Sequence, residues 1–338
     1  MLVGRFLHTE SLVTGYPGKN VKVISENLNL QLRSSEVICL LAPNGSGKTT
    51  LVKTLSGFLT PLGGKIFLEG KEITQISPAK KARMLSVVLT ERFQSSNMSV
   101  YSLVSLGRSP YTGWWGAFSR RDHHEVKLAI GEMHLEPLQS RALSTLSDGE
   151  RQKAMIARAL AQDTPLIMLD EPTAHLDLPN RVDIMKRLKR LAHIRKKAVL
   201  ITTHDLDLAL QTADRLWLIM PDGSVVDGVP EDLILNGMFE HAFQIDQATF
   251  DRSSGRFLVT DANCGKIAVP GASEAEFWAR KALQRIGLRT SEFNSGTVLK
   301  YDPDNGQYVI TKNQKSWKAG SIEKLISIIL REELWDPI

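Results

Sequence analysis

The residues from Ala42 to Thr50 form a glycine-rich loop that is suited to binding phosphate groups. The run lies between a predicted buried strand at 37–41 and a predicted helix that begins near Gly47. In this context the backbone N–H groups of the loop and the positive end of the helix surround the phosphates of a nucleotide, so we predict a P-loop. Lys48 is placed to contact the same oxygens, and the hydroxyl of Thr49 is placed to ligate Mg²⁺. The predicted binding residues are Asn44, Gly45, Ser46, Gly47, Lys48, Thr49 and Thr50.

Two adjacent carboxylates supply the complementary chemistry. The apolar run 166–169 is a predicted buried strand, and Asp170 and Glu171 follow it directly. Asp170 is placed to hold Mg²⁺ through water, and Glu171 is placed to act as a general base toward an attacking water. Together with the P-loop, this pair predicts the hydrolysis of a nucleoside triphosphate.

Length and composition limit the classes of protein that fit. A chain of 338 residues corresponds to roughly two domains, and its 42% apolar and 23% charged residues argue against disorder, collagen or a coiled coil. The net charge of +5 favours anionic partners, such as nucleotides, lipid headgroups or nucleic acid. No window approaches ~18 apolar residues and no signal-peptide core is visible, so we expect neither a membrane span nor export. Cys39 and Cys264 match no metal spacing and are expected to be reduced thiols.

The chemistry-bearing residues are embedded in an alternation of strands and helices. Buried strands are predicted at 37–41, 166–169 and 198–203, and a helical pattern lies between the last two. Such alternation indicates an α/β fold with a mostly parallel sheet that is covered on both faces. Residues 1–40 read as short β segments, with 27–32 as an alternating strand, whereas a helical period dominates from about 91 to 160.

After about residue 240 the pattern changes to a small α+β module at 243–338. The segment from Phe250 to Phe257 recurs as Tyr301 to Tyr308, and each copy reads as a β-hairpin. A short strand and a helix follow in both copies, the first helix beginning with a capping box at Ser273. We interpret this as a duplicated hairpin–strand–helix unit, while a chance similarity of two hairpins remains the alternative.

Three further motifs carry a resemblance to a known family. They are Leu146-Ser147-Asp148-Gly149-Glu150 before a helix, Ala174-His175-Leu176-Asp177 after the acidic pair, and His204 at the end of a strand. Over residues 1–240 the chain resembles the ATP-binding subunit of an ABC transporter. The resemblance implies a P-loop (RecA-like) parallel-sheet core with an antiparallel β subdomain and a helical signature subdomain at about 91–160. It also implies that residues 1–242 form one ATP-hydrolysing cassette.

The resemblance further implies roles for individual residues. Ser147 and Gly149 would contact ATP that is held by the P-loop of a second copy, and Asp177 is also a predicted nucleotide-binding residue. His204 matches the switch histidine that contacts the γ-phosphate, so Lys48, Glu171 and His204 form the predicted catalytic set. Tyr16 matches the aromatic residue that stacks on adenine, with core packing as the alternative.

This chain departs from the family pattern at three places. Ala42 stands where the P-loop usually has its first glycine. Thr90 stands where the family has a glutamine that ligates Mg²⁺ or its water, and Glu91 or Gln94 are alternative substitutes. Asp148 and Glu150 replace glycine and glutamine in the signature, so we expect some repulsion toward a docking triphosphate.

The segment from Ser99 to Tyr111 resembles the ATPases of importers for iron–siderophores, haem and vitamin B12. This resemblance predicts that Thr90 to Tyr111 forms the cleft that receives a helix of a membrane permease, with Leu103 and Arg108 as coupling residues. Trp114 and Trp115 are read either as an interface anchor or as a cap on the local core.

We therefore expect an ATPase, acting with Mg²⁺ as a homodimer, that powers import of an iron chelate, haem or cobalamin through a permease. A substrate-binding protein is an indirect partner, and the expected location is the cytoplasmic face of the membrane. The alternatives are a soluble ABC ATPase without a permease (cluster-assembly type), an importer ATPase for another cargo, or a regulator that only binds ATP. No nucleic acid is expected, because the basic run 186–197 keeps helical spacing and reads as a solvated helix face. The C-terminal module is either regulatory or a structural appendage.

Overall fold

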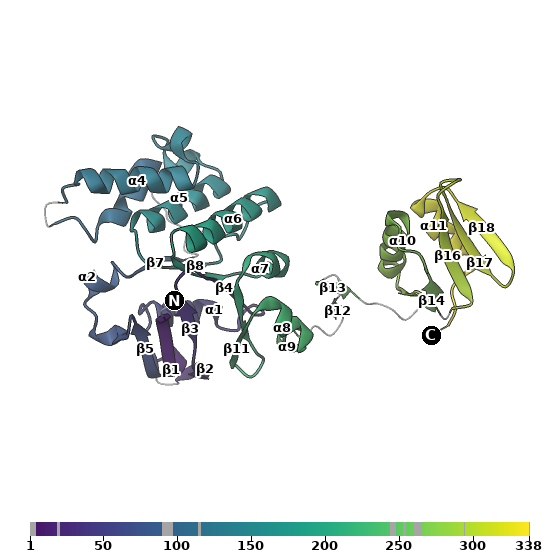
Figure 1. The fold of residues 1–338 in the computed structure, drawn as a ribbon, viewed down its shortest axis with the longest axis horizontal. Coiled ribbons are helices and arrows are strands. Elements are labelled where there is room, and N and C mark those ends of the chain that lie inside the picture. Colours follow the sequence, from purple (N-terminus) through teal and green to yellow (C-terminus); the bar gives the residue numbers. More distant parts are fainter. Residues whose placement is uncertain are drawn as a thin grey trace. The chain divides into compact units, whose positions relative to one another are not determined.

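The computed structural model divides into two compact units, residues 1–244 and 245–338. Each unit is described by itself below (Figure 1). The residues whose structure is described are 5–18, 21–89, 97–113, 116–243, 248–252, 255–259, 265–293 and 295–337.

The first unit contains a six-stranded sheet in the order β11-β10-β4-β9-β8-β7. All of its neighbouring strands are parallel except β11, which pairs antiparallel with β10 at one edge. Every residue of β4, β8 and β9 is buried, as expected for apolar strands that are covered on both faces of a parallel sheet. The strands are β4 (Val37–Leu41), β7 (Leu85–Val88), β8 (Leu166–Asp170), β9 (Ala198–Thr202), β10 (Arg215–Ile219) and β11 (Val225–Gly228).

A second sheet of the same unit is antiparallel, in the order β2-β1-β5-β6 with β3 also paired to β1. The run 27–32, predicted as one strand, is interrupted here: β2 ends at Leu28 and β3 begins at Gln31. Asn27, within β2, has a left-handed φ of 55°, and the pairing of β2 with β1 shifts register between Ser25 and Leu28. The strands are β1 (Arg5–Tyr16), β2 (Lys22–Leu28), β3 (Gln31–Arg33), β5 (Gly63–Leu68) and β6 (Lys71–Glu72).

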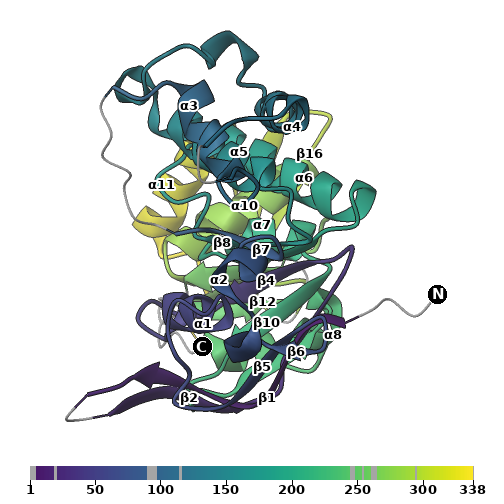
Figure 2. The same ribbon diagram turned by 90° about the vertical axis from the view of Figure 1, so that its left-hand side faces the viewer.

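Helices pack around these sheets. Three of them, α3, α4 and α5, form a group at one end of the unit. Figures 1 and 2 show α3, α4 and α5 on one side of the parallel sheet and the antiparallel strands on the other. The described residues of this unit also contain four short 3₁₀ segments, at Ile73–Gln75, Leu106–Arg108, Glu136–Leu138 and Leu143–Thr145. The helices are α1 (Lys48–Leu55), α2 (Pro78–Lys81), α3 (Val100–Ser105), α4 (Arg120–Glu132), α5 (Asp148–Ala161), α6 (Leu178–Ile194), α7 (Leu206–Thr212), α8 (Pro230–Leu235) and α9 (Met238–Ala242).

The second unit contains the repeated pattern that the sequence predicts. Phe250 pairs with Phe257, and Tyr301 pairs with Tyr308, each as directly opposite residues of a hairpin whose rings are 5.0 Å apart. The first hairpin forms a two-stranded sheet, while the second belongs to a five-stranded sheet in the order β15-β14-β16-β17-β18. The elements are β12 (Ala248–Asp251), β13 (Arg256–Val259), β14 (Gly265–Ala268), α10 (Glu274–Arg285), β15 (Leu288–Ser291), β16 (Thr297–Asp302), β17 (Gln307–Lys312), β18 (Lys315–Ala319) and α11 (Ile322–Glu332).

The two copies differ in how their third strands pair. β18 continues the second hairpin as an antiparallel neighbour of β17, whereas β14 is parallel to both β15 and β16. Apolar residues of the five-stranded sheet and of α10 and α11 share one core, which includes Ile267, Leu283 and Ile329. The duplication is therefore one of local segments and does not extend to the strand pairing.

Candidate nucleotide-binding and hydrolysis site

The P-loop connects the end of β4 to the start of α1 and leaves its backbone amides available. Gly45 and Gly47 have positive φ values of 81° and 99°, which favour glycine. A Cβ atom at Gly47 would lie 2.2 Å from Cγ2 of Ile24, so this position also has no room for a side chain. Within the described residues, the N–H groups of Gly45, Gly47, Lys48 and Thr49 donate to no protein acceptor. These amides, at the N-terminus of a helix, fit the phosphate groups of a nucleotide.

Lys48 is the only cation of this loop, and its ammonium group is held inside it. The side chain is largely buried, and Nζ donates to the carbonyl oxygens of Ala42, over 2.9 Å, and of Pro43, over 3.3 Å. Burial lowers the pKa of Lys48, and the nearby carboxylates of Glu171 and Asp170 partly offset this effect. The ammonium thus faces the two acidic residues of the site, where the charge of a triphosphate would stabilise it.

Thr49 and Asp170 are 121 positions apart in the sequence and are in contact in the structure. The Thr49 hydroxyl donates to Oδ2 of Asp170 over 2.9 Å. A hydroxyl and a carboxylate are the hard oxygen ligands that Mg²⁺ prefers, and here they already lie side by side. The residues present therefore fit a Mg²⁺ ion.

Glu171 and His204 meet because the strands that precede them are neighbours. β8 and β9 are parallel and adjacent, so the residues that follow them emerge at the same edge of the sheet. Nδ1 of His204 lies 3.6 Å from Oε2 of Glu171, and both side chains are partly exposed. Glu171 has a φ of 50°, a left-handed conformation that is uncommon for a residue with a side chain.

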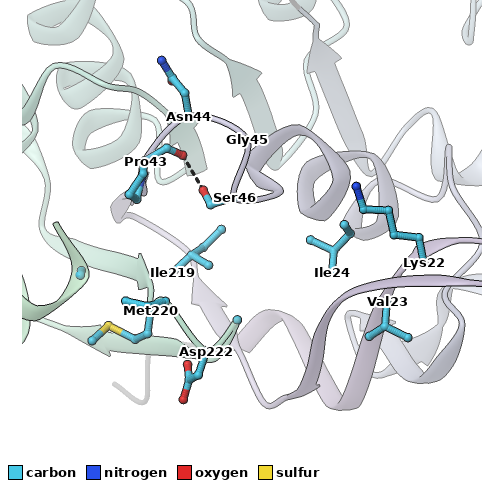
Figure 3. A pocket seen from close by; sticks show the side chains of 13 residues that line it. Lys22, Val23, Ile24, Pro43, Asn44, Gly45, Ser46, Ile219, Met220 and Asp222 are labelled. Carbon is cyan, nitrogen blue, oxygen red and sulfur yellow. Dashed lines mark hydrogen bonds between the residues drawn. The ribbon is translucent and has the colours of Figure 1, made fainter. Parts of the chain in front are cut away.

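Tyr16 ends β1 and reaches the P-loop helix, where its hydroxyl and that of Thr50 are 3.0 Å apart. Its side chain is 46% exposed, so core packing is not its role, while stacking on adenine stays a prediction. A pocket of ≈ 580 Å³ also adjoins the loop, lined by β2, by Pro43 to Ser46 and by the turn after β10. Figure 3 shows Ile24 and Ile219 beneath the loop, with Ser46 bonded to the carbonyl of Pro43.

The signature residues lie at the N-terminus of α5 and contact the start of α6. Ser147 caps α5, and its hydroxyl donates to Oε2 of Glu150 over 2.9 Å. A Cβ atom on Gly149 would lie 3.2 Å from Nδ2 of Asn180, whose side chain donates to Oδ1 of Asp177 over 2.7 Å. Within the described part of the chain, Ser147 makes no hydrogen bond to the P-loop.

Some predicted residues lie outside the described residues. They are Thr90 with its alternatives Glu91 and Gln94, the tryptophans 114 and 115, and Cys264. Cys39 is described, and it is a buried free thiol whose pKa burial raises to about 12.

Leu103 and Arg108, predicted as coupling residues in a docking cleft, are both buried, which argues against direct contact of either side chain with a permease helix, while their coupling role stays a prediction. Leu103 is 0% exposed and Arg108 is 2% exposed. Nε of Arg108 donates to Asp122 over 2.9 Å, and its guanidinium group lies 3.9 Å from the ring centre of Tyr111. A buried ion pair with a stacked aromatic ring supports the fold of the helical subdomain. The resemblance placed Arg108 in a docking cleft, and only the tertiary contacts reveal that it is buried.

The basic run 186–197 is likewise less solvated than its sequence suggests. Arg187 and Arg195 form ion pairs with Asp183 and Glu132. Lys197 is 8% exposed and pairs with Asp163 over 3.0 Å, so a solvated face is the wrong description for this residue.

Sequence reasoning missed Thr202, which touches both acidic residues of the site. Its hydroxyl donates to Asp170 over 2.7 Å and accepts the N–H of Glu171 over 2.8 Å. The available signal was the position of Thr202 at the end of a buried strand, two residues before His204. Using that signal would have required knowing that β8 and β9 are adjacent.

Comparisons with known proteins show which family this chain resembles in sequence. Residues 25–174 match the family described as ABC transporter, and residues 264–330 match the Iron ABC transporter C-terminal domain. The chain is 35% identical over 251 residues to the petrobactin import ATP-binding protein of Bacillus anthracis, covering 74% of this chain and 91% of that protein. It is 32% identical over 240 residues to the iron(3+)-hydroxamate import ATP-binding protein of Bacillus subtilis, covering 71% and 88%.

A solved structure has the same fold. A nucleotide-free ATP-binding cassette from an ABC transporter matches with a TM-score of 0.61 and 25% identity, covering 70% of this chain and 96% of that one. The predicted P-loop α/β fold is thus confirmed, and within the described residues no helix is long and apolar enough to cross a bilayer. The chain belongs to the ABC transporter family of ATP-binding proteins, and it is an ATPase of that family.

Proposed function

We propose that two copies of this chain bind ATP and Mg²⁺ between them and hydrolyse the ATP to drive import through a membrane permease. The cargo class is an iron chelate, haem or cobalamin, delivered to the permease by a substrate-binding protein. The chain would lie at the cytoplasmic face of the membrane. One observation carries the proposal: the P-loop, the Thr49–Asp170 pair and the Glu171–His204 pair converge at one edge of the parallel sheet.

The chemistry follows from the position of each group. The amides of the P-loop and the Lys48 ammonium bind the phosphates, and Glu171 accepts a proton from the water that attacks the γ-phosphate. His204, 3.6 Å from Glu171, would contact the γ-phosphate. Thr49 and Asp170 would hold Mg²⁺, which neutralises charge on the phosphate oxygens. In this proposal Thr90, Glu91 or Gln94 adds a further ligand.

The second copy supplies the rest of the site. Ser147 and Gly149 lie at the N-terminus of a helix that no hydrogen bond in the described residues links to the P-loop of the same chain. A helix N-terminus binds anions, so we propose that it closes on the γ-phosphate that the partner copy holds. Asp177, joined to this region through Asn180, would face the partner at the same interface.

The cargo proposal rests on the relatives and on the C-terminal unit. The similar proteins of Bacillus are named for the import of petrobactin and of iron(3+)-hydroxamate, and the C-terminal match is an iron transporter domain. An iron chelate is therefore the cargo class that we favour over haem and cobalamin. We propose a regulatory role for this C-terminal unit.

The main test of the mechanism is Glu171→Gln. This change keeps the size of the side chain and removes the proton acceptor, so turnover should fall by roughly 10²–10⁴-fold while ATP still binds. ATPase rate and binding of a fluorescent ATP analogue are the measurements, with Glu69→Gln on an exposed turn as a matched control. Turnover of Glu171→Gln at the parental rate would show that the base is another group.

The permease partner separates the proposal from its rival, a soluble ATPase that acts without a permease. The full-length chain, tagged and extracted from membranes with mild detergent, should copurify with a hydrophobic permease. If it is recovered only from the soluble fraction and only as itself, the transport proposal fails while the ATPase assignment stands.

A further inference from the structure

Thr202 is the last residue of β9, and it contacts both acidic residues at the end of β8. The side chain is fully buried at 0% exposed. Its hydroxyl donates to Oδ1 of Asp170 over 2.7 Å and accepts the backbone N–H of Glu171 over 2.8 Å. Its carbonyl oxygen accepts the same N–H over 3.1 Å. One residue on the neighbouring strand thus holds two consecutive residues of the site.

The directions of these bonds are determined by chemistry. An ionised carboxylate only accepts hydrogen bonds and a backbone N–H only donates, whereas a hydroxyl has one proton and two lone pairs. The Thr202 hydroxyl must therefore give its proton to Asp170 and accept from Glu171. A valine at this position would have the same shape and could do neither.

The bond to Asp170 sets the orientation of that carboxylate. With Oδ1 bound to Thr202, Oδ2 faces the Thr49 hydroxyl on α1, 2.9 Å away. The two oxygens of Asp170 thus have different partners on two different elements. This arrangement presents one defined oxygen, beside Thr49, to a metal ion.

The bond to Glu171 holds a backbone conformation that is otherwise uncommon. Glu171 has a φ of 50°, and its N–H is shared between the hydroxyl and the carbonyl oxygen of Thr202. From this conformation its carboxylate reaches to within 3.6 Å of His204. Strained backbone persists where surrounding bonds determine it, and Thr202 supplies these bonds.

We propose that Thr202 is a positioning residue for hydrolysis, whose hydroxyl orients Asp170 for Mg²⁺ and fixes Glu171 as the base. The inference rests on the proposed roles of Asp170 and Glu171. It assigns to the chain a residue that acts through two others.

The test compares Thr202→Val, which removes only the hydroxyl, with Thr202→Ser, which retains it. Thr164→Val is the matched control, because Thr164 is equally buried and its hydroxyl bonds to Ser86 and Leu166 at the other end of β8. The readouts are kcat, KM for ATP, thermal stability, and binding of a fluorescent ATP analogue with and without Mg²⁺.

Thr202→Val should lower kcat by about 10–100-fold, as loss of the partner of a metal ligand typically does. Analogue binding without Mg²⁺ should stay at the parental level, since the P-loop is intact, but the Mg²⁺ dependence of binding should move to higher concentrations. Thr202→Ser should recover most of kcat. Thr164→Val should lose stability without these changes.

Two results would overturn the inference: parental kcat and Mg²⁺ dependence in Thr202→Val, or equal losses in the serine and valine variants. If the valine variant does not fold, Thr202→Ala against Thr202→Ser makes the same comparison, because they differ only by the hydroxyl. An inactive Glu171→Gln beside a fully active Thr202→Val would refute this inference alone, whereas an active Glu171→Gln would refute the proposed function beneath it.

Discussion

Two helices of this chain begin at predicted phosphate-binding positions, and their N-termini are built differently. At α1 the N-cap is Gly47, with no side-chain cap and no acidic residue in the first turn. At α5 the N-cap is Ser147, and the first turn carries Asp148 and Glu150. The four N–H groups at the start of any helix lack intrahelical partners, so each end must find acceptors elsewhere.

The end of α5 is satisfied in part by the protein itself. Glu150 Oε2 accepts hydrogen bonds from the N–H and the hydroxyl of Ser147, at 2.8 and 2.9 Å, in a reciprocal capping box. These bonds lower the pKa of Glu150, so the carboxylate is charged at neutral pH. At α1, by contrast, the N–H groups of Gly47, Lys48 and Thr49 donate to no protein acceptor in the described residues.

Two similar helix ends can therefore differ in how many of their N–H groups are free to bind a ligand. An anion at α1 would meet several N–H groups that donate to no protein acceptor in the described residues, whereas at α5 the N–H and the hydroxyl of Ser147 already donate to Glu150. We therefore expect a single chain to bind ATP at α1, and the signature to engage only when a partner presents the γ-phosphate.

The largest expected difference in ATP binding is between a variant altered at the start of α1 and a variant altered at the start of α5. Lys48→Ala deletes the cation of the P-loop and should abolish most ATP binding by the isolated chain, because no other cation of the loop faces the phosphates. Ser147→Ala should leave that binding unchanged. Titration with a fluorescent ATP analogue under conditions that prevent dimerisation measures both.

Mixing the Lys48→Ala and Ser147→Ala variants tests whether the signature of one copy acts on the nucleotide that the other copy holds. In a heterodimer, one site would contain both altered residues and the other would be intact, so at most one of the two sites regains hydrolysis. No recovery of ATPase activity on mixing would contradict closure of the signature on the partner's nucleotide.

A smaller effect is expected from Glu150→Gln. Glutamine can still form the capping box, but it removes one negative charge from the place where a triphosphate docks. ATP-induced dimerisation should therefore occur at a several-fold lower ATP concentration, measured by size-exclusion chromatography with light scattering. Asp148→Asn removes an exposed charge next to Ser147 and serves as the comparison. If both variants dimerise at the parental ATP concentration, these carboxylates do not repel the docking triphosphate.

The smallest effect concerns acid stability. Because the folded-state pKa of Glu150 is lowered, its cap stabilises the protein above the ordinary glutamate range and this contribution is lost as pH falls through the lowered pKa. The parent should therefore lose more stability than Glu150→Gln as the pH is lowered from neutral through this pKa, and solvent screening keeps the difference small for a partly exposed side chain. Denaturant unfolding across pH 3–7, about the range in which glutamate titrates, measures this difference; parallel curves for the two proteins would refute it.

Prediction from sequence worked best where the signal is local. The strand before the P-loop, predicted at 37–41, is β4 with the same bounds, and the hairpins around Phe250 and Tyr301 pair in the same register. Hydrophobic runs and turn residues determine such segments within a few positions of one another. The capping box predicted at Ser273 is present for the same reason.

Prediction failed where a residue's role depends on distant partners. The resemblance placed Arg108 in a docking cleft, but its guanidinium group is buried and donates to Asp122 and to the carbonyl oxygen of Ala161. The third strands of the two repeats read alike, yet β14 pairs in parallel with β15 because α10 crosses between them, while a tight turn makes β18 antiparallel to β17.

By itself, the sequence determined that this protein has a P-loop between a strand and a helix, an acidic pair after a second strand, and a change of architecture after about residue 240. These follow from periodicity and turn chemistry, which act over short stretches of chain. Only the tertiary structure decided that Thr49 touches Asp170 and that Thr202 holds Asp170 and Glu171. Both contacts depend on which strands and helices become neighbours, and a local pattern does not specify that.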